Sequence, residues 1–224
     1  MNEKELAYYF DHTYLKPFAT TKELYQLCDE AKELGCHMVA INSSPVKMCR
    51  EYLGESKVHV GAAIGFPLGQ QTIASKVFET RDALDNGADE IDYVINIGEA
   101  KMHNWKYLED EMRQIVELVH SYGREVKVIF ENCYLEDEEK VELCHIARNV
   151  GPDFIKTSTG FGTGGATLQD VRLMKKEVGD TVKVKAAGGI RDLKTCLAMI
   201  EAGASRIGTS SSVKIINELR ETNK

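Results

Sequence analysis

A lysine stands near the end of a short apolar stretch, directly before a loop rich in hydroxyl groups and glycine. The stretch is DFIKTSTGFGTGGAT, residues 153–167, and the lysine is Lys156. A neutral lysine amine is a nucleophile that attacks carbonyl groups and forms Schiff bases. A free lysine is mostly protonated at neutral pH, because its pKa is about 10.4. A reactive Lys156 therefore needs surroundings that disfavour its charge.

Two further charged residues lie inside segments that read as β-strands. They are Asp92 in EIDYVIN and Lys185 in VKVKAAG. A lone buried charge is costly, so proteins pair it, neutralise it or use it. A neighbouring cation such as Lys185, together with partial burial, lowers the pKa of a lysine, and a carboxylate such as Asp92 can move protons. The three residues together favour Schiff-base chemistry with acid–base assistance.

The residues alone leave two alternatives open. Asp92 and a lysine can form a purely structural ion pair, since structural networks also contain charges with shifted pKa values. Lys127 and Lys183 show the same alternation one layer away, so spacing does not decide which lysine reacts. The composition of the loop that follows Lys156 favours that lysine.

Two loops rich in glycine and serine indicate a phosphate site. AAGGIRD places Gly188 and Gly189 before one helix, and GTSSSV places Ser210 and Ser211 before another. Free backbone N–H groups and the helix dipole attract an anion at a helix N-terminus. Each loop alone also fits an ordinary cap or turn, but the pair is more specific. Gly160 is a candidate for a third backbone donor.

A repeated unit must position these residues. Seven β/α units follow one another from residue 20 onward, with short connections and no linker. The first helix runs between a Thr20 cap and Gly35, and the second has Ser44 as its N-cap and ends at Gly54. The later helices are predicted at 72–86, 105–122, 137–150, 167–178, 192–202 and near 212–221. The strands are predicted at 37–42, 57–66, 90–98, 125–131, 153–158, 182–188 and 205–211.

This alternation predicts an α/β protein with a parallel sheet. Residues 8–15, YYFDHTYL, supply an eighth strand, so we predict a single (β/α)8 TIM barrel domain over residues 1–224. The alternative is an open doubly wound sheet, which is disfavoured because no GxGxxG follows the first strand. In the barrel, Lys156 and Lys185 would lie on adjacent strands near the C-terminal ends, where barrel enzymes carry their chemistry.

Composition excludes several kinds of partner. The net charge is −7 without a basic cluster, which argues against a nucleic-acid surface. No apolar run approaches the roughly 20 residues of a membrane helix, and the first ten residues lack the apolar segment of a signal peptide. The six cysteines form no CxxC pair, and the six histidines show no metal-ligand spacing. We therefore expect a cytoplasmic protein with reduced thiols, no membrane partner, no metal and no cofactor.

Several of these segments, in this order, resemble the deoxyribose-phosphate aldolase family. They are DHTYLKPFAT, EIDYVINIG, IKTSTGFGTGGAT, VKAAGGIRD and RIGTSSS. The resemblance implies a class I aldolase that needs no metal and reversibly cleaves 2-deoxy-D-ribose 5-phosphate to acetaldehyde and D-glyceraldehyde 3-phosphate. It implies that Lys156 forms the Schiff base, that Asp92 and Lys185 move protons, and that the protein is a homo-oligomer, either a dimer or a tetramer.

Other expectations concern the substrate. Asp11 and Thr13, at the end of the first strand, are expected to contact substrate hydroxyl groups. The chain departs from the family pattern at Ala40, Asn132 and Phe161, which leaves its substrate range open. Two other functions stay possible: another phosphate-binding barrel enzyme, such as an isomerase or a different Schiff-base aldolase, and a catalytically silent phosphometabolite-binding protein. Borohydride trapping and an assay for acetaldehyde release distinguish them.

Overall fold

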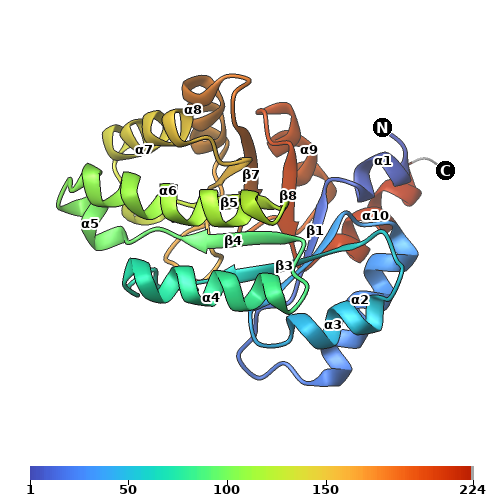
Figure 1. Ribbon diagram of the computed structural model, residues 1–224. Helices are drawn as coiled ribbons and strands as arrows, with labels where there is room; N and C mark the ends of the chain where they lie inside the picture. The colour runs from blue at the N-terminus through green and yellow to red at the C-terminus, as the bar shows by residue number, and fades with distance from the viewer. Residues whose placement is uncertain (223–224) are drawn as a thin grey trace.

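Eight parallel strands close into a barrel in the computed structural model, which describes residues 1–222. Each strand pairs with its neighbours in sequence, and β8 pairs with β1 to close the ring. The helices lie around the outside of the strands (Figure 1). The predicted TIM barrel is confirmed, and the open sheet is wrong because it would leave β1 and β8 unpaired.

The strands are shorter than predicted but lie at the predicted places. They are β1 Phe10–Thr13, β2 Met38–Asn42, β3 His59–Ile64, β4 Glu90–Val94, β5 Glu125–Ile129, β6 Phe154–Lys156, β7 Lys183–Ala187 and β8 Arg206–Thr209. The helices are α1 Glu3–Ala7, α2 Thr21–Leu34, α3 Val46–Leu53, α4 Ile73–Asp85, α5 Ile97–Lys101, α6 Trp105–Ser121, α7 Asp137–Val150, α8 Leu168–Val178, α9 Leu193–Glu201 and α10 Ser212–Thr222, with a 3₁₀ turn at Asn132–Tyr134. None of the helices within residues 1–222 combines the length and apolar character needed to cross a membrane.

Local signals account for most helix ends. The capping box between Thr20 and Glu23 starts α2, and Gly35 ends it in the left-handed conformation. The N-cap of α3 is Pro45 and not Ser44. The backbone N–H of Val46 bonds to the carbonyl of Ser43 in a turn, which moves the helix start by one residue.

Two short helices were not predicted, because five residues are too few to show a helical repeat. The predicted strand at 90–98 ends early, since the N–H of Asn96 donates to the Glu111 carboxylate at 3.1 Å and the Asn96 side chain caps α5. At the other end of the barrel, α1 packs beside α10, and Arg220 Nε lies 2.8 Å from the Glu3 carboxylate. The first and the last helix therefore lie side by side (Figure 1).

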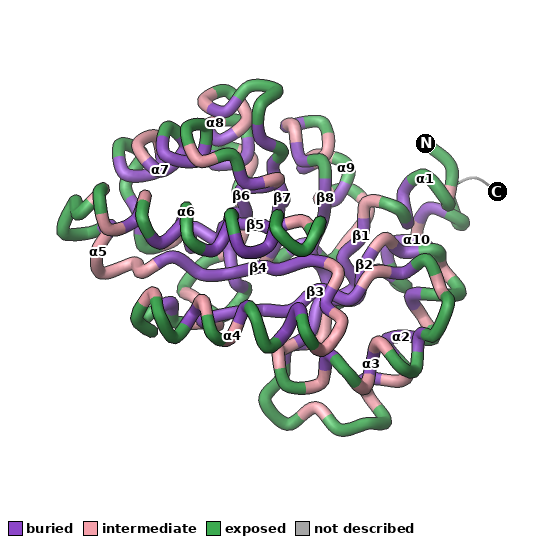
Figure 2. Tube along the Cα trace, in the orientation of Figure 1, coloured by how far each residue is buried: buried purple, intermediate pink, exposed green. Residues whose placement is uncertain are grey.

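The strands separate two interiors of different character. Figure 2 shows the strands buried along most of their length. Alternate residues such as Ile91 and Val128 face the helices and belong to one continuous apolar core. Their sequence neighbours, such as Asp92 and Lys127, face the barrel axis. The apolar layer holds the fold together by burial, while charged side chains gather along the axis beside a few apolar ones such as Phe154.

Candidate active site

Seven buried charged side chains fill the middle of the barrel. None is more than 4% exposed. They are Asp11, Glu90, Asp92, Lys127, Lys156, Lys185 and Arg206. Strand register brings them together, because Asp92 lies beside Lys127, Lys156 beside Lys185, and Lys185 beside Arg206. The prediction that Lys156 and Lys185 occupy adjacent strands is confirmed.

Asp92 is the centre of this network. Its Oδ2 accepts hydrogen bonds from Lys156 Nζ at 2.9 Å and Lys185 Nζ at 2.6 Å, and its Oδ1 accepts one from Lys127 Nζ at 2.9 Å. Burial alone would raise the pKa of Asp92, but the three ammonium groups, Lys127 first, hold it well below its usual value. Asp92 is therefore a carboxylate that contacts three lysines.

Lys156 is the lysine whose charge is least favoured. Its pKa is lowered to about 8, first by burial and then by the positive charge of Lys185, with a smaller contribution from Lys127. The carboxylate of Asp92 opposes this shift. Burial is thus the main cause, and the neighbouring cation is the second.

A charge balance explains why one lysine can lose its proton. The network contains three carboxylates and four cations, so it carries one surplus positive charge when every group is ionised. Burial disfavours the charge of Lys127, but Asp92 and Glu90 raise its pKa above the usual value. Asp11 and Glu90 likewise raise the pKa of Arg206 against the effect of burial. Deprotonation of Lys156 leaves the network neutral.

A cavity of about 570 Å³ opens above this network, at the C-terminal ends of the strands. Lys156 lies at its floor, and the predicted residues Thr13, Gly160, Gly188, Gly189 and Ser210 line its wall. Asp92 and Lys185 do not line the cavity: Asp92 contacts Lys156 from below, and Lys185, on the adjacent strand, contacts the same oxygen of Asp92. The arrangement presents the buried Lys156 amine to a ligand, with a carboxylate and a second cation beneath it.

Two predicted residues lie elsewhere. Asp11 is fully buried, is paired with Lys185 and accepts a bond from Arg206 Nε at 2.8 Å. It does not line the cavity, because its place in β1 puts it in the charged layer below. Ser211 is also absent from the cavity wall, and its N–H donates to Thr209 Oγ1 at 2.9 Å.

Glu131 is a site residue that sequence reasoning missed. It follows β5 in the left-handed conformation, with φ of 59°. Its carboxylate accepts the Thr159 N–H at 3.0 Å and also the Thr159 hydroxyl. Burial raises the pKa of Glu131. Glu131 thus holds the loop that begins one residue after Lys156, and its only sequence signal is an acidic residue at the end of an apolar strand.

Close backbone contact joins the loops after β6 and β7. Gly188 has a φ of +87°, and a Cβ atom there would lie 3.0 Å from Gly165 Cα and 3.4 Å from Gly160 Cα. A Cβ on Gly165 would lie only 2.3 Å from the Gly188 carbonyl oxygen. Glycine is therefore required at this crossing, and Gly160 and Gly188 both line the cavity.

The two predicted helix N-termini differ as anion sites. In α9 the first-turn donors are taken, since Thr195 N–H bonds to Asp192 at 2.8 Å and Leu193 N–H bonds to Glu218 at 2.7 Å. Gly188 and Gly189 therefore offer loop amides and not the end of a helix. The start of α10 follows directly after Ser210 and Ser211.

Cationic side chains at the cavity wall were also missed. Lys16 and Arg191 both line it. Arg191 follows the glycine pair, which is the only sequence signal for its position. His12 also lines the wall, with Nε2 2.8 Å from Glu30 and Nδ1 3.0 Å from Ser212 Oγ. Burial lowers the pKa of His12, so its neutral ring is favoured as a fixed part of the wall.

The three departures from the family pattern have different surroundings. Phe161 lines the cavity and packs edge-on against Phe66, with ring centroids 5.3 Å apart. Asn132 is buried and donates to the sulfur of Met174 at 3.2 Å. Ala40 lies in β2 beside Thr13. Phe161 is the one of these three that lies at the cavity wall, so it bears most directly on which substrates fit.

Comparisons with known proteins agree with this chemistry. Residues 6–217 match the DeoC/LacD family of aldolases. The deoxyribose-phosphate aldolase of Thermococcus kodakarensis is 53% identical over 218 residues, which cover 96% of this chain and 97% of that protein. The Lactobacillus acidophilus deoxyribose-phosphate aldolase is 55% identical over 216 residues, covering 96% and 91%. The solved tetrameric deoxyribose phosphate aldolase from Aeropyrum pernix superimposes with a TM-score of 0.90 at 32% identity, covering 99% and 93%.

Proposed function

The chain belongs to the DeoC/LacD family of aldolases, and on this premise we propose that it is a deoxyribose-phosphate aldolase. It cleaves 2-deoxy-D-ribose 5-phosphate to acetaldehyde and D-glyceraldehyde 3-phosphate, and it catalyses the reverse addition. The observation that carries the proposal is the buried Lys156 amine at the cavity floor, with its pKa lowered to about 8. Relatives with this activity at about half identity over nearly the full chain support the choice of substrate.

The reaction begins when the neutral amine of Lys156 attacks the aldehyde carbon of the open-chain sugar. The carbinolamine takes up a proton and loses water to give an iminium ion. Removal of the proton from the hydroxyl at carbon 3 then breaks the bond between carbons 2 and 3. The bonding electrons move into the iminium to form an enamine, and glyceraldehyde 3-phosphate leaves. Protonation of the enamine and hydrolysis release acetaldehyde and restore the amine.

Asp92 and Lys185 serve these proton transfers. Asp92 Oδ2 lies within hydrogen-bond distance of both Lys156 and Lys185, so a proton can pass between the two amines through one oxygen. Lys127 keeps Asp92 ionised from the opposite side. Asp11 contacts Lys185 and acts on the site electrostatically, and it does not touch substrate in this proposal.

The substrate phosphate binds at the wall formed by Gly160, Gly188, Gly189 and Ser210. Loop N–H groups supply donors, and Lys16 and Arg191 add positive charge. Ser211 stands behind Ser210 at the start of α10. Anchoring the phosphate sets the distance to the reacting carbon, and such positioning can contribute several kcal/mol. The Thr13 hydroxyl is left to contact a sugar hydroxyl. No cofactor is needed, because the iminium itself accepts the electrons.

The proposal extends to assembly and location. We propose a homo-oligomer, either a dimer or a tetramer, in the cytoplasm. The related aldolase from Aeropyrum pernix is a tetramer. Light scattering after size-exclusion chromatography measures the assembly, and a monomer at micromolar concentration contradicts it.

Borohydride trapping tests the function directly. The protein is incubated with 2-deoxyribose 5-phosphate and borohydride, digested, and mapped by mass spectrometry. We expect a reduced adduct on Lys156, and an adduct on Lys127 or Lys183 instead contradicts the assignment. A coupled assay for acetaldehyde release separates an aldolase from an isomerase or from a silent binding protein, neither of which releases it.

A further inference from the structure

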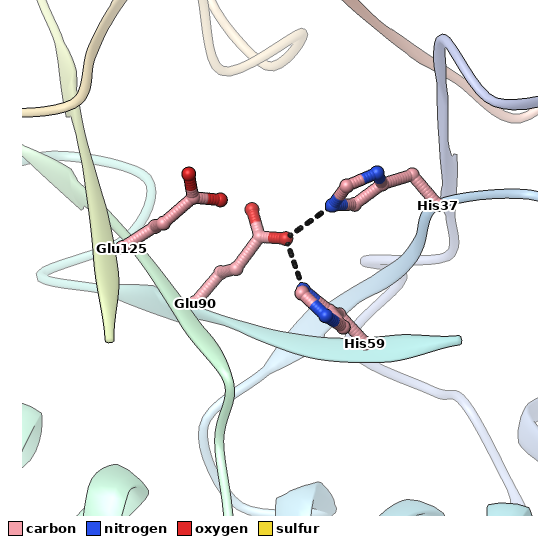
Figure 3. A group of neighbouring side chains, drawn as sticks. All are labelled: His37, His59, Glu90 and Glu125. Atoms are coloured by element: carbon pink, nitrogen blue, oxygen red, sulfur yellow. Dashed lines mark hydrogen bonds and ion pairs between the residues drawn. The ribbon is translucent and has the colours of Figure 1, made fainter. Parts of the chain in front are cut away.

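A second group of titratable side chains lies at the opposite, N-terminal end of the barrel. It consists of His37, just before β2, and of His59, Glu90 and Glu125, the first residues of β3, β4 and β5. One ligand atom from each of the four lies within 4.8 Å of the others. Figure 3 shows the two imidazole rings turned toward Glu90, with Glu125 on its other side. We propose that these four side chains bind a divalent transition metal ion of the zinc class.

The donor types select the class of ion. Two imidazole nitrogens and two carboxylates suit tetrahedral zinc, whereas magnesium and calcium prefer oxygen ligands alone. Zinc bonds of about 2.1 Å set tetrahedral ligand atoms about 3.4 Å apart. Glu90 Oε1 lies 3.2 Å from His37 Nε2 and 2.7 Å from His59 Nδ1. Glu90 Oε1 is thus close to coordinating separation from both histidine nitrogens, and the four ligand atoms lie within 4.8 Å of one another, so small shifts admit an ion.

His37 supplies an independent sign of a ligand. Within the described residues, both of its ring nitrogens are shielded from solvent and make no hydrogen bond. The Nε2 atom is near Glu90 but not aligned for a bond. Buried polar atoms without partners are uncommon and call for an explanation, such as an absent ion. The Tyr8 and His59 rings pack edge-on against His37 at 4.6 and 4.8 Å, which fixes its orientation.

Surrounding charges orient Glu90 for this role. Its other oxygen, Oε2, is paired with Lys127, and Arg206 Nη2 donates to both oxygens, at 3.0 Å to Oε2 and 3.2 Å to Oε1. Partners of this kind orient metal-ligating carboxylates, and here they hold Oε1 next to the two histidines. The positive charges of Lys127 and Arg206 also repel an added metal ion. The negative charge of Glu125 offsets this repulsion, because Glu125 is paired with no cation among residues 1–222. His59 is 42% exposed, which gives an ion a route from solvent.

Metal titration of the full-length protein tests the site. The protein is treated with a chelator, dialysed, and titrated with Co²⁺ and then with Zn²⁺. We expect one ion per chain and the visible absorption of tetrahedral cobalt without a thiolate-to-metal band. We expect Glu125→Gln and His59→Ala each to weaken Zn²⁺ binding by at least about tenfold. The matched control is His145→Ala, since His145 is an exposed histidine near Glu142 and Glu177, and it should bind as the unmodified protein does.

Thermal unfolding gives a second readout that does not depend on activity. A ligand that binds only the folded state raises Tm, so Zn²⁺ should raise Tm of the unmodified protein and of His145→Ala more than that of Glu125→Gln. Glu125 makes no side-chain hydrogen bond among residues 1–222, so this variant should fold even if His59→Ala does not. Equal binding by Glu125→Gln and the control, octahedral cobalt spectra, or a thiolate band overturns the proposal.

Discussion

Lys127 and Lys156 are two buried lysines in one network, yet their pKa values move in opposite directions. Lys127 lies deeper in the barrel, in a lower layer of charges that it forms with Glu90, Asp92 and Asp11, and its pKa is raised. Lys156 lies in the upper layer, at the cavity floor, where Asp92 is its one ion-pair partner among residues 1–222, and its pKa is lowered to about 8. Both are desolvated. The number of neighbouring carboxylates, and not burial alone, therefore decides which lysine keeps its proton.

The size of this difference matters for catalysis. A shift of the Lys156 pKa from 10.5 to about 8 corresponds to about 3 kcal/mol against the ammonium form. At neutral pH it raises the fraction of neutral amine by about 300-fold. The lower layer keeps its charges and stabilises the barrel, while the upper layer provides a nucleophile. Variants that alter one layer at a time test this division.

The largest effect is expected from Lys156→Met. Loss of the nucleophile should lower kcat/KM by at least about 10³-fold. The variant should not be less stable at pH 7, because the removed ammonium is disfavoured in the folded protein. This advantage should shrink as pH rises above about 8 and vanish above the unfolded value of 10.5, where the amine is neutral in both states. Steady-state kinetics measure kcat/KM, and urea unfolding measures stability. A large loss of stability at pH 7 contradicts the comparison.

Lys185→Leu should have the next largest effect. It removes a cation that lowers the pKa of Lys156 and a member of the proton relay. We expect turnover to fall by about 10²- to 10³-fold and the pH–rate profile to move to higher pH. Kinetics from pH 6 to 10 provide the measurement. An unmoved profile with reduced turnover would assign Lys185 to proton transfer alone.

The unmodified enzyme should show a pH dependence set by the upper layer. Lys156 attacks only when neutral, so kcat/KM should rise with pH up to about 8 and then level off. Asp92 adds no second transition in this range, because its pKa lies well below its usual value. A profile that falls between pH 6 and 8 is incompatible with a neutral Lys156 as nucleophile.

Lys127→Met alters the lower layer and should affect stability strongly and chemistry indirectly. Breaking buried ion pairs with Glu90 and Asp92 should destabilise the protein by about 3–5 kcal/mol. Because Lys127 also lowers the pKa of Lys156, the profile should move to higher pH and activity at pH 7 should fall by about tenfold. Chemical denaturation and pH-dependent kinetics test the two parts. Lys183→Met, at an exposed lysine, is the control, and it should change neither the stability nor the pH profile of activity.

The smallest effect is expected from Glu131→Gln. The amide keeps the shape of the side chain, but its NH2 group replaces one of the two oxygens that each accept a Thr159 bond, so one of these bonds is lost. The loop that carries Gly160 should loosen, and KM should rise about fivefold with a smaller change in kcat. Initial rates over a range of substrate concentrations separate the two. A fall in kcat alone would place Glu131 in proton transfer and not in positioning.

Patterns along the chain determined the fold and singled out Lys156, Asp92 and Lys185, which the barrel brings together in one network. Strand alternation, caps and glycine stops marked every strand and the long helices, because these signals are local. Predicted boundaries were wrong where a tertiary hydrogen bond changes the course of the backbone. The bond from the Asn96 N–H to the Glu111 carboxylate, for example, ends β4 early. The helices α1 and α5 were missed since they are too short for periodicity.

Only the closed barrel decided how the charges combine. Pairing of β1 with β8 brings the Asp11 carboxylate to the Arg206 side chain, 195 positions away, and puts Asp11 below the cavity, whereas the sequence predicted that it contacts substrate. Strand register joins Lys127 to three carboxylates and leaves Lys156 with one. It also gathers His37 and His59 around Glu90, although their spacing resembles no metal motif. The sequence shows which residues each strand carries. The pKa of a buried lysine depends on the charges around it, and in this barrel those charges lie on other strands.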